Sequence, residues 1–293
     1  MGIKYLNKFL QNHCQKSIRK IHMKELGNKT ITIDTSILIY QFIAQNALLE
    51  NMKSLIFLFS KYNIHPIFIF DGKPPEEKQE LLNQRKMQKE LAKKKYLELL
   101  EKHDLVTDLD EKQKMWEQLE TLKKQCTRIK VADILAIKEL FHTHGVQYQD
   151  SKREADELCV FLVQKGVAWG CMSDDTDMFL YGCNHVLRCF DLSNETVLLY
   201  DTQGILKNLD MTMKMFREIM VLSGTDYNIG HSDMSLFKTM AWYKKYKKFL
   251  LNIDDKQQKL TFYEWLQKYT KYVIDYSQLL VVNNMFCISD NCR

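Results

Sequence analysis

The run Pro66-Ile67-Phe68-Ile69-Phe70-Asp71 decides the fold, because it is a short, strongly apolar strand pattern that stops at an acidic residue. Thr30-Ile31-Thr32-Ile33 has the same pattern and stops at Asp34, and Val167–Met172 leads to Ser173-Asp174-Asp175. Helical patterns lie between these runs. Such alternation predicts an α/β fold with a mainly parallel central sheet and helices on both faces.

The remaining elements extend this alternation. Further strands are expected at Gly145–Tyr148, which leads to Asp150, and in a late pair at Val186–Phe190 and Thr196–Tyr200. Helices are expected at Ser36–Met52, Glu76–Lys102, Asp110–His142, Glu154–Gln164 and Thr212–Leu222, and the aromatic residues from 262 to 286 indicate a final helical packing element.

The composition excludes several classes of protein. The 293 residues are 45% hydrophobic and 11% aromatic, which is too apolar for a disordered chain. No uncharged run is long enough to span a bilayer, and the first residues do not form a signal peptide, so a membrane or secreted protein is not expected. The eight cysteines contain no Cys-x-x-Cys pair, so we expect free buried thiols and no zinc site. The net charge of +5 is compatible with a nucleic-acid partner but does not require one.

Several predicted strands end in aspartate, and the carboxyl ends of parallel strands meet at one edge of a sheet, where ligands bind. Carboxylates from neighbouring strands would therefore lie close together. At an effective dielectric constant of about 20, two like charges ~4 Å apart repel by roughly 4 kcal/mol, so a cation is expected between them. Mg²⁺ or Mn²⁺ fits best, since both prefer hard carboxylate oxygens.

Each acidic or basic motif also has an ordinary structural explanation. Ser151-x-x-Glu154 is the pattern of a capping box, and Asp174–Asp177 suits a solvated turn or a helix cap. Asp226 could be a plain loop acid and Tyr40 a core aromatic. A helix with mixed charges, such as Glu76–Lys102, is usually just solvated.

Six motifs in a fixed order resemble those of the flap endonuclease/XPG family of structure-specific 5′ nucleases. They are Met1-Gly2-Ile3, Ile33-Asp34-Thr35-Ser36 with Tyr40-Gln41-Phe42, Phe70-Asp71-Gly72-Lys73-Pro74-Pro75, Glu154-Ala155-Asp156, Asp175-x-Asp177 and Gly224-Thr225-Asp226-Tyr227. The resemblance covers residues 1 to about 230, and Glu154-Ala155-Asp156-Glu157 is closer to the 5′ exonuclease branch.

The resemblance implies a PIN-like (resolvase-like) α/β domain in which seven carboxylates hold two Mg²⁺ ions, for which Mn²⁺ can substitute. By motif, one cluster comprises Asp34, Asp71, Glu154 and Asp156, and the other comprises Asp175, Asp177 and Asp226, with Asp156 near both metals. Lys78 and Arg85 match a basic pair that contacts the scissile phosphate. Tyr40 matches an aromatic residue that stacks on the base next to the cut, and Gly2 lies near the active site in this family. Lys89 and Lys93 share a helix face with Lys78 and Arg85, where a basic surface would follow the DNA strand.

The same resemblance predicts one nuclease domain over residues 1–293. Its parts are an N-terminal nuclease region (1–84), a helical arch or cap (85–135), an internal nuclease region (136–225) and a degenerate helix–two-turn–helix module with C-terminal helices (226–293). In the last part, Asn228-Ile229-Gly230-His231-Ser232-Asp233-Met234-Ser235 stands where the family has a Gly-Ile-Gly turn with Pro-Lys. Only one of those glycines is kept, which argues against K⁺ binding by this segment.

The expected function is Mg²⁺-dependent, structure-specific hydrolysis of DNA phosphodiester bonds at 5′ flaps and 5′ ends by a two-metal mechanism, in DNA replication, repair or recombination. Two alternatives stay open: a 5′ nuclease acting on RNA, and a catalytically silent nucleic-acid-binding member of the fold. The expected partner is branched or 5′-ended DNA, with no membrane. No sliding-clamp peptide is found near residue 293, and a monomer is expected. The expected location is intracellular, in the nucleus or at a viral or cytoplasmic replication site.

Overall fold

A seven-stranded sheet forms the centre of the computed structural model, which describes residues 2–106, 108–228, 234–252, 260–271 and 276–288. The strand order is β1-β7-β6-β5-β2-β3-β4, with β1 Ile18–His22, β2 Thr30–Asp34, β3 His65–Phe70, β4 Gln147–Asp150, β5 Gly170–Met172, β6 His185–Asp191 and β7 Thr196–Asp201. The strands from β6 through β5, β2 and β3 to β4 pair in parallel, while β7 pairs antiparallel with β6 and β1. The predicted mainly parallel sheet is confirmed.

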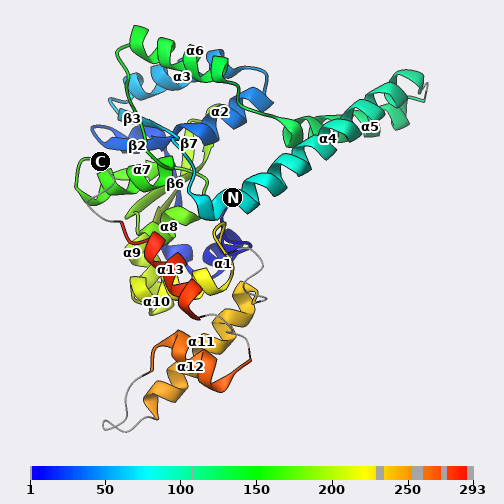
Figure 1. The fold of residues 1–293 in the computed structure, drawn as a ribbon. Helices are drawn as coiled ribbons and strands as arrows, with labels where there is room; N and C mark the ends of the chain where they lie inside the picture. The colour runs from blue at the N-terminus through cyan, green and yellow to red at the C-terminus, as the bar shows by residue number, and fades with distance from the viewer. Residues whose placement is uncertain (1, 107, 229–233, 253–259, 272–275, 289–293) are drawn as a thin grey trace.

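Helices cover both faces of this sheet (Figure 1). They are α1 Leu6–His13, α2 Thr35–Ala44, α3 Leu48–Lys61, α4 Gln79–Leu105, α5 Leu109–Cys126, α6 Val131–Thr143, α7 Ala155–Gln164, α8 Asp177–Tyr181, α9 Thr202–Leu209, α10 Met213–Leu222, α11 Leu236–Leu251, α12 Phe262–Tyr269 and α13 Tyr276–Met285. The described residues also form short 3₁₀ helices, namely η1 Gln15–Ser17, η2 Met23–Leu26 and η3 Glu76–Lys78.

Strand β3 shows how the sheet separates two hydrophobic cores. Its alternate residues Ile67 and Ile69 belong to the core that contains α7, α8 and α10, whereas Phe68 and Phe70 belong to the core that contains α2, α3 and α6. This follows from the two-residue period of a strand. Because both faces are buried from Ile67 to Phe70, this part of β3 is apolar throughout, and that is why its sequence is the clearest strand signal.

Two expected helices are each divided into two. The helix predicted over Ser36–Met52 breaks between α2 and α3, where Asn46 adopts a left-handed conformation (φ 54°) that asparagine tolerates better than most residues. The helix predicted over Asp110–His142 ends at Cys126, because Thr127 and Lys130 are extended (ψ 134° and 155°) and carry the chain from α5 to α6. Both single-helix predictions are wrong.

The edge strand β1 was not predicted. Its sequence, Ile-Arg-Lys-Ile-His, has two adjacent exposed basic residues and so lacks a strict alternation. Pairing with β7 over five residues makes it a strand, and this long-range contact has no local sequence signal. The strand expected over Val167–Met172 is also shorter, since only Gly170–Met172 pairs.

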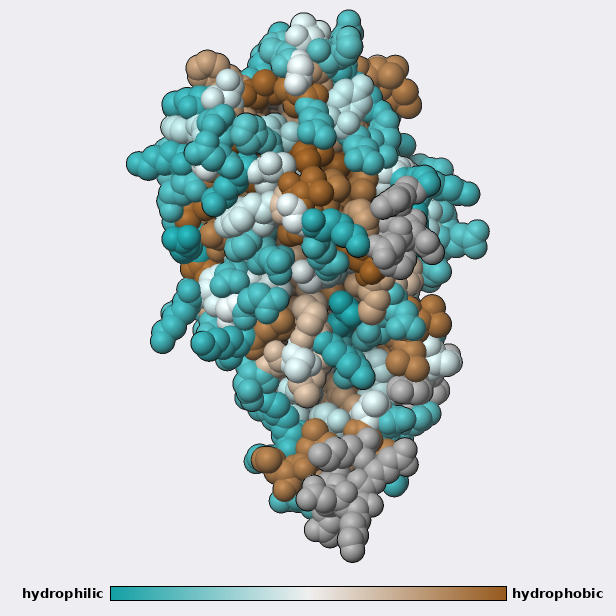
Figure 2. Space-filling model, turned by 90° about the vertical axis from the view of Figure 1, so that its left-hand side faces the viewer, coloured by the Kyte–Doolittle hydropathy of each residue, from teal (hydrophilic) through white to brown (hydrophobic). Residues whose placement is uncertain are grey.

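Helices α4 and α5 pack against each other and project from the body as a hairpin (Figure 1). Within its described part the hairpin buries only Ala92 and Leu119, so most of its side chains face solvent. Hydrophilic side chains also cover most of the face of the molecule drawn in Figure 2.

The C-terminal helices pack through aromatic rings, as expected for residues 262 to 286. Tyr243 and Tyr246 of α11 contact Phe262 of α12 with ring centroids 5.4 and 5.3 Å apart. Helix α11 begins after Ser235, whose hydroxyl accepts from the Lys238 backbone amide. Residues 229–233, on which the K⁺ prediction depends, lie outside the described residues.

The cysteines that the structure describes are free thiols, as expected, but not all of them are buried. Cys14, Cys159, Cys171 and Cys183 are buried, Cys126 is half-buried, and Cys189 and Cys287 are exposed. Cys292 lies outside the described residues. In the part of the chain that is described, no helix combines the length and the apolar character needed to cross a membrane.

Replacing Phe68 with alanine should lower the free energy of unfolding by about 3–5 kcal/mol, because its ring is fully buried and packs on Phe141, with the two ring centroids 4.3 Å apart. The matched control is Phe57→Ala on α3, where the side chain is 70% exposed, and there we expect a change within about 0.5 kcal/mol. Urea denaturation measures both. Equal losses in the two variants would contradict the assignment of Phe68 to the core.

Candidate active site

Seven acidic residues predicted from the motifs gather at the carboxyl edge of the sheet. Asp34 ends β2, Asp71 follows β3, Glu154 and Asp156 begin α7, Asp175 lies between β5 and α8, Asp177 opens α8 and Asp226 follows α10. A cavity of about 230 Å³ lies between these elements, and Asp34, Asp71, Glu154, Asp156 and Asp175 line it. Asp177 and Asp226 are buried beside it.

Hydrogen bonds from neighbouring elements fix the carboxylates on β2 and β3. Asp71 accepts from the Ala155 backbone amide at 2.9 Å and from the Ser36 hydroxyl at 2.5 Å. Asp34 accepts from the Ser173 hydroxyl at 3.1 Å. The Asp71 carboxylate thus joins the starts of α2 and α7. Ser36 and Ser173 are site residues to which the sequence analysis assigned no role.

Glu154 points into the cavity and does not form a capping box. It is the N-cap residue of α7, but its carboxylate makes no cap hydrogen bond. One oxygen pairs with Lys78 Nζ, and the other accepts from the Tyr227 hydroxyl at 2.5 Å. The capping explanation is therefore wrong, and Tyr227 is a third site residue, after the two serines, to which the sequence analysis assigned no role, although it directly follows Asp226.

Arg85 of α4 reaches the last predicted acid, with its Nη2 2.8 Å from Asp226 Oδ2. The turn that presents Asp226 is held by Asn228, which is 1% exposed. Its side-chain oxygen accepts from the Thr225 amide at 2.7 Å, and its side-chain nitrogen donates to the Val221 carbonyl at 2.8 Å. Asn228 therefore fixes the position of Asp226 relative to α10.

The oxygen-rich donor set fits a hard divalent cation. Among the described residues, Asp156 Oδ1 and Asp177 Oδ1 are buried without a hydrogen-bond partner, which is costly for a carboxylate unless a cation faces it. The part of the chain that is described holds no three acidic, histidine or cysteine side chains already arranged around one point. Instead, Lys78 and Arg85 each pair with one of the acids.

Gly2 lies against the same acids. A Cβ atom at this position would stand 2.2 Å from Thr176 Oγ1 and 2.6 and 2.7 Å from carboxylate oxygens of Asp175 and Asp177. Its φ of +77° is also favourable only for glycine. Only glycine fits this contact between the start of the chain and the acid cluster.

Tyr40 lies at the rim of the cavity and is not a core aromatic, since it is 36% exposed. Lys89 of α4 covers it, with Nζ 3.2 Å from the Tyr40 hydroxyl and 4.6 Å from the ring centroid. Lys93 is exposed one turn further along α4 and is not among the residues that line this cavity.

Comparison with known proteins identifies the family. The XPG N-terminal domain matches residues 1–92, and the XPG I-region matches residues 145–226. Flap endonuclease 1 of Methanococcus aeolicus is 32% identical over 233 residues, covering 72% of this chain and 67% of that protein. The chain belongs to the flap endonuclease/XPG family.

Other relatives agree with this membership. A probable RAD2-like endonuclease of Invertebrate iridescent virus 6 is 30% identical over 284 residues, covering 78% of this chain and 67% of that protein. The fold is shared with the catalytic core of Rad2 in complex with DNA substrate (TM-score 0.65, 20% identity, 98% of this chain and 85% of that one). It is also shared with flap endonuclease-1 from Methanococcus jannaschii (TM-score 0.59, 21% identity, 94% and 84%).

The protein is therefore a nuclease of a metal-dependent family. Both matched segments contain predicted site residues: Asp34, Asp71, Lys78 and Arg85 in the first, and Glu154, Asp156, Asp175, Asp177 and Asp226 in the second. Between them, residues 93–144 match neither model and comprise the outer part of α4 together with α5 and α6.

Burial and mutual repulsion raise the pKa values of several carboxyl groups in this site. Burial, followed by the charges of Asp71 and Asp175, raises the pKa of Asp34 to about 8. Burial likewise raises the pKa of Asp156, Asp175 and Asp177.

The basic residue of the cavity responds in the opposite sense. Burial alone would lower the pKa of Lys78, but the charge and hydrogen bond of Glu154 outweigh it and raise that pKa above its usual value. The lysine therefore stays positively charged among carboxylates that resist ionisation.

The raised pKa of Asp34 predicts how stability depends on pH in the presence of EDTA. The folded protein keeps a proton on Asp34 that the unfolded chain releases near pH 4, so the contribution of this carboxyl group to the free energy of unfolding should be greatest below about pH 4. It should fall as the pH rises toward 8, by up to roughly 1.4 kcal/mol per pH unit.

In urea denaturation, the free energy of unfolding of Asp34→Asn should fall less steeply between pH 4 and 8 than that of the wild type. The variant lacks the carboxyl group that keeps its proton in the folded state and releases it on unfolding. Asp110→Asn on the exposed surface of α5 is the control for removing one acidic group. Identical pH profiles for wild type and Asp34→Asn would contradict the raised pKa.

Proposed function

We propose that this nuclease is a Mg²⁺-dependent, structure-specific 5′ nuclease that hydrolyses DNA phosphodiester bonds at 5′ flaps and 5′ ends. One observation carries the proposal: a single cavity is lined by five carboxylates, Lys78, Arg85 and Tyr40. Carboxylates suit a divalent metal, the two cations suit a phosphate, and the aromatic ring suits a base, so the cavity offers a subsite for each part of a nucleic-acid strand.

The seven acids would hold the metal ions. Asp34, Asp71, Glu154 and Asp156 form one candidate ligand set, and Asp175, Asp177 and Asp226 form the other, with Asp156 near both. Mg²⁺ bound there would supply Lewis-acid stabilisation of a phosphoryl oxygen and a more acidic water molecule. The buried, unpartnered oxygens of Asp156 and Asp177 support this assignment.

Lys78 and Arg85 would bind the phosphate that is cleaved. Both line the cavity, and each is held there by a carboxylate, Lys78 by Glu154 and Arg85 by Asp226. Such pairs keep the cations in place before the substrate arrives. Preplaced positive charge stabilises the negative charge that develops on the phosphate in the transition state.

Tyr40 would stack on the base beside the cleaved bond, and the basic residues of α4 would follow the strand. Stacking and backbone contacts tolerate any sequence, so the shape of the junction would decide where the enzyme cuts. Rad2 and GEN1, which share the fold, have been solved with a DNA substrate and with Holliday junction DNA, respectively, which supports DNA as the substrate here.

The test of this proposal is a panel of 3′-labelled substrates with Mg²⁺: a 5′ flap, a nick, a gap, a blunt duplex and a matched RNA flap. We expect cleavage near the base of the DNA flap, slower removal of 5′-terminal nucleotides, and no cleavage with EDTA. Preferred hydrolysis of the RNA flap would favour the RNA alternative. Cleavage that persists in EDTA would contradict the metal assignment.

Asp177→Asn should reduce flap cleavage by at least roughly a hundredfold, because a buried carboxylate assigned to the metal is lost, while binding to the flap in EDTA is retained. Glu157→Gln is the matched control. Its carboxylate lies in the first turn of α7 but faces Arg153 at 3.8 Å, so we expect cleavage near the wild-type rate. Single-turnover cleavage and anisotropy measure the two quantities.

Tyr227→Phe should slow cleavage by about ten- to a hundredfold with little change in KM, since it removes the hydroxyl that orients Glu154. Tyr263→Phe is the matched control. It removes a buried tyrosine hydroxyl that donates to the Glu218 carbonyl at 2.8 Å, and Tyr263 does not line the cavity. Both variants should lose about 1 kcal/mol of stability, and only the first should lose activity. Equal kcat values would show that Tyr227 is purely structural.

A further inference from the structure

Helix α13 packs on α10 (Figure 1), and the residue that follows it, Phe286, is completely buried. Neither segment that matches a family model extends past residue 226, so Phe286 lies outside both. Its ring nevertheless reaches the site, because it packs edge-to-face on two tyrosines. The ring centroids lie 5.0 Å from that of Tyr181 and 5.5 Å from that of Tyr227. Phe286 therefore fills the space between these two rings.

Tyr227 connects Phe286 to two charged groups of the acid-lined cavity. Its hydroxyl donates to Glu154 at 2.5 Å, and its ring centroid lies 5.6 Å from Lys78 Nζ. Lys78 in turn pairs with Glu154. Because edge-to-face contacts favour one relative orientation of two rings, Phe286 limits the directions in which the Tyr227 hydroxyl can point.

The other side of the Phe286 ring is held by α8, the short helix that Asp177 opens and Tyr181 ends. Arg217 of α10 strengthens this contact. Its Nε donates to the Leu180 carbonyl at 2.9 Å, and its Nη1 lies 2.9 Å from the sulfur of Cys287. The ends of α8 and α13 are thus tied to the same arginine, so the ring of Phe286 has a firm support on the side away from Tyr227.

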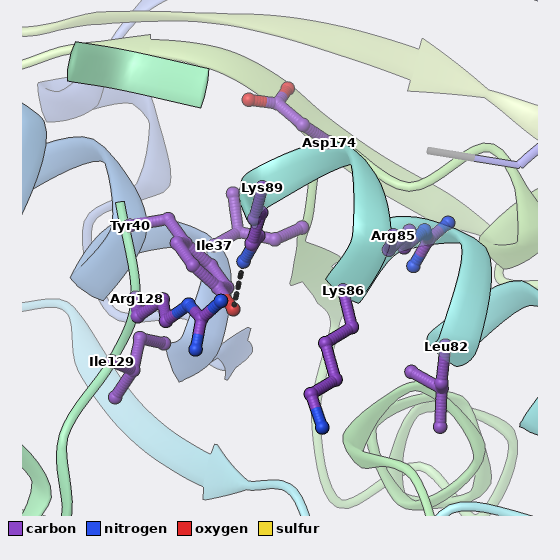
Figure 3. A pocket seen from close by; sticks show the side chains of 9 residues that line it. All are labelled: Ile37, Tyr40, Leu82, Arg85, Lys86, Lys89, Arg128, Ile129 and Asp174. Carbon is purple, nitrogen blue, oxygen red and sulfur yellow. Dashed lines mark hydrogen bonds between the residues drawn. The ribbon is translucent and has the colours of Figure 1, made fainter. Parts of the chain in front are cut away.

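Phe286 can influence the reaction only through its neighbours. None of the described residues of α13, nor Phe286 itself, lines the acid-lined cavity or the cavity of about 570 Å³ beside it, whose lining residues Figure 3 shows. Residues that orient a metal-binding or charged side chain from behind are nevertheless important for activity, and their loss typically costs roughly ten- to a hundredfold.

We propose that Phe286 is a positioning residue of this nuclease: its ring holds the Tyr227 hydroxyl on Glu154, and so keeps Glu154 and Lys78 in the arrangement that hydrolysis requires. The inference rests on the proposed function, in which Glu154 binds a metal ion and Lys78 binds the cleaved phosphate. The end of α13 thereby completes a centre whose seven acids and two cations all lie within the matched segments.

The test is Phe286→Leu, which removes the ring but keeps an apolar side chain, assayed on the 3′-labelled 5′ flap with Mg²⁺. We expect kcat to fall about tenfold and KM to stay within about twofold of the wild type, because the lining of the cavity is unchanged.

Phe262→Leu is the matched control. Phe262 is 1% exposed, and its ring also contacts two tyrosines, with centroids 5.4 Å from Tyr243 and 5.3 Å from Tyr246. Urea denaturation should show a similar loss of stability in Phe262→Leu and Phe286→Leu, whereas Phe262→Leu should keep the wild-type kcat.

A double-mutant cycle with Tyr227→Phe separates positioning from general destabilisation. Once the Tyr227 hydroxyl is absent, Phe286 has nothing left to orient, so adding Phe286→Leu should slow cleavage by less than about twofold further. Phe286→Met repeats the cycle at a smaller cost in stability, since its flexible side chain fills the space left by the ring.

A wild-type kcat in both Phe286→Leu and Phe286→Met would overturn the inference. An equal loss of kcat in Phe262→Leu, or a cycle in which the two losses multiply in full, would overturn it as well. Failure of the proposed function is seen separately, as no Mg²⁺-dependent cleavage of the flap by the wild type.

Discussion

Repulsion among buried carboxylates is the constraint on which the site depends. Asp34, Asp175 and Asp177 are buried at one edge of the sheet and Asp156 is half-buried there, and burial raises the pKa of all four. A fold gains no stability from such a cluster, so the cluster is explained by what it binds. The hydrophobic cores on both faces of the sheet supply the stability that offsets its cost.

Two basic side chains reduce this cost. Lys78 at the start of the hairpin pairs with Glu154, and Arg85 two turns further along pairs with Asp226. These ion pairs connect the base of α4 to α7 and to the turn after α10. The same contacts therefore neutralise the acids and hold the hairpin on the body, and in the proposed function they keep two cations ready for a phosphate.

The extent to which this site could be predicted differs from residue to residue. The acids at the ends of β2 and β3 were predictable from local patterns. An apolar strand pattern followed by aspartate indicates both the edge of the sheet at which the strand ends and the carboxylate that lies there. The pairing of Glu154 with Lys78 and Tyr227 was not predictable, because Ser151-x-x-Glu154 is also the pattern of a capping box. Only the tertiary contacts of Glu154 distinguish a site residue from a capping residue. Edge strand β1 was not predicted for a similar reason, since its conformation comes from pairing with β7 and not from its local sequence.

The few buried side chains of the α4–α5 hairpin also bear on how such nucleases diversify. Where most residues face water, packing places few demands on sequence or length, and insertions are tolerated better than in a sheet. The stretch that neither family model matches, residues 93–144, includes most of this hairpin. In the proposed function, the hydrolytic centre and the hairpin that would admit its substrate are thus under separate constraints, and selection could alter which nucleic-acid shapes are accepted without disturbing the chemistry.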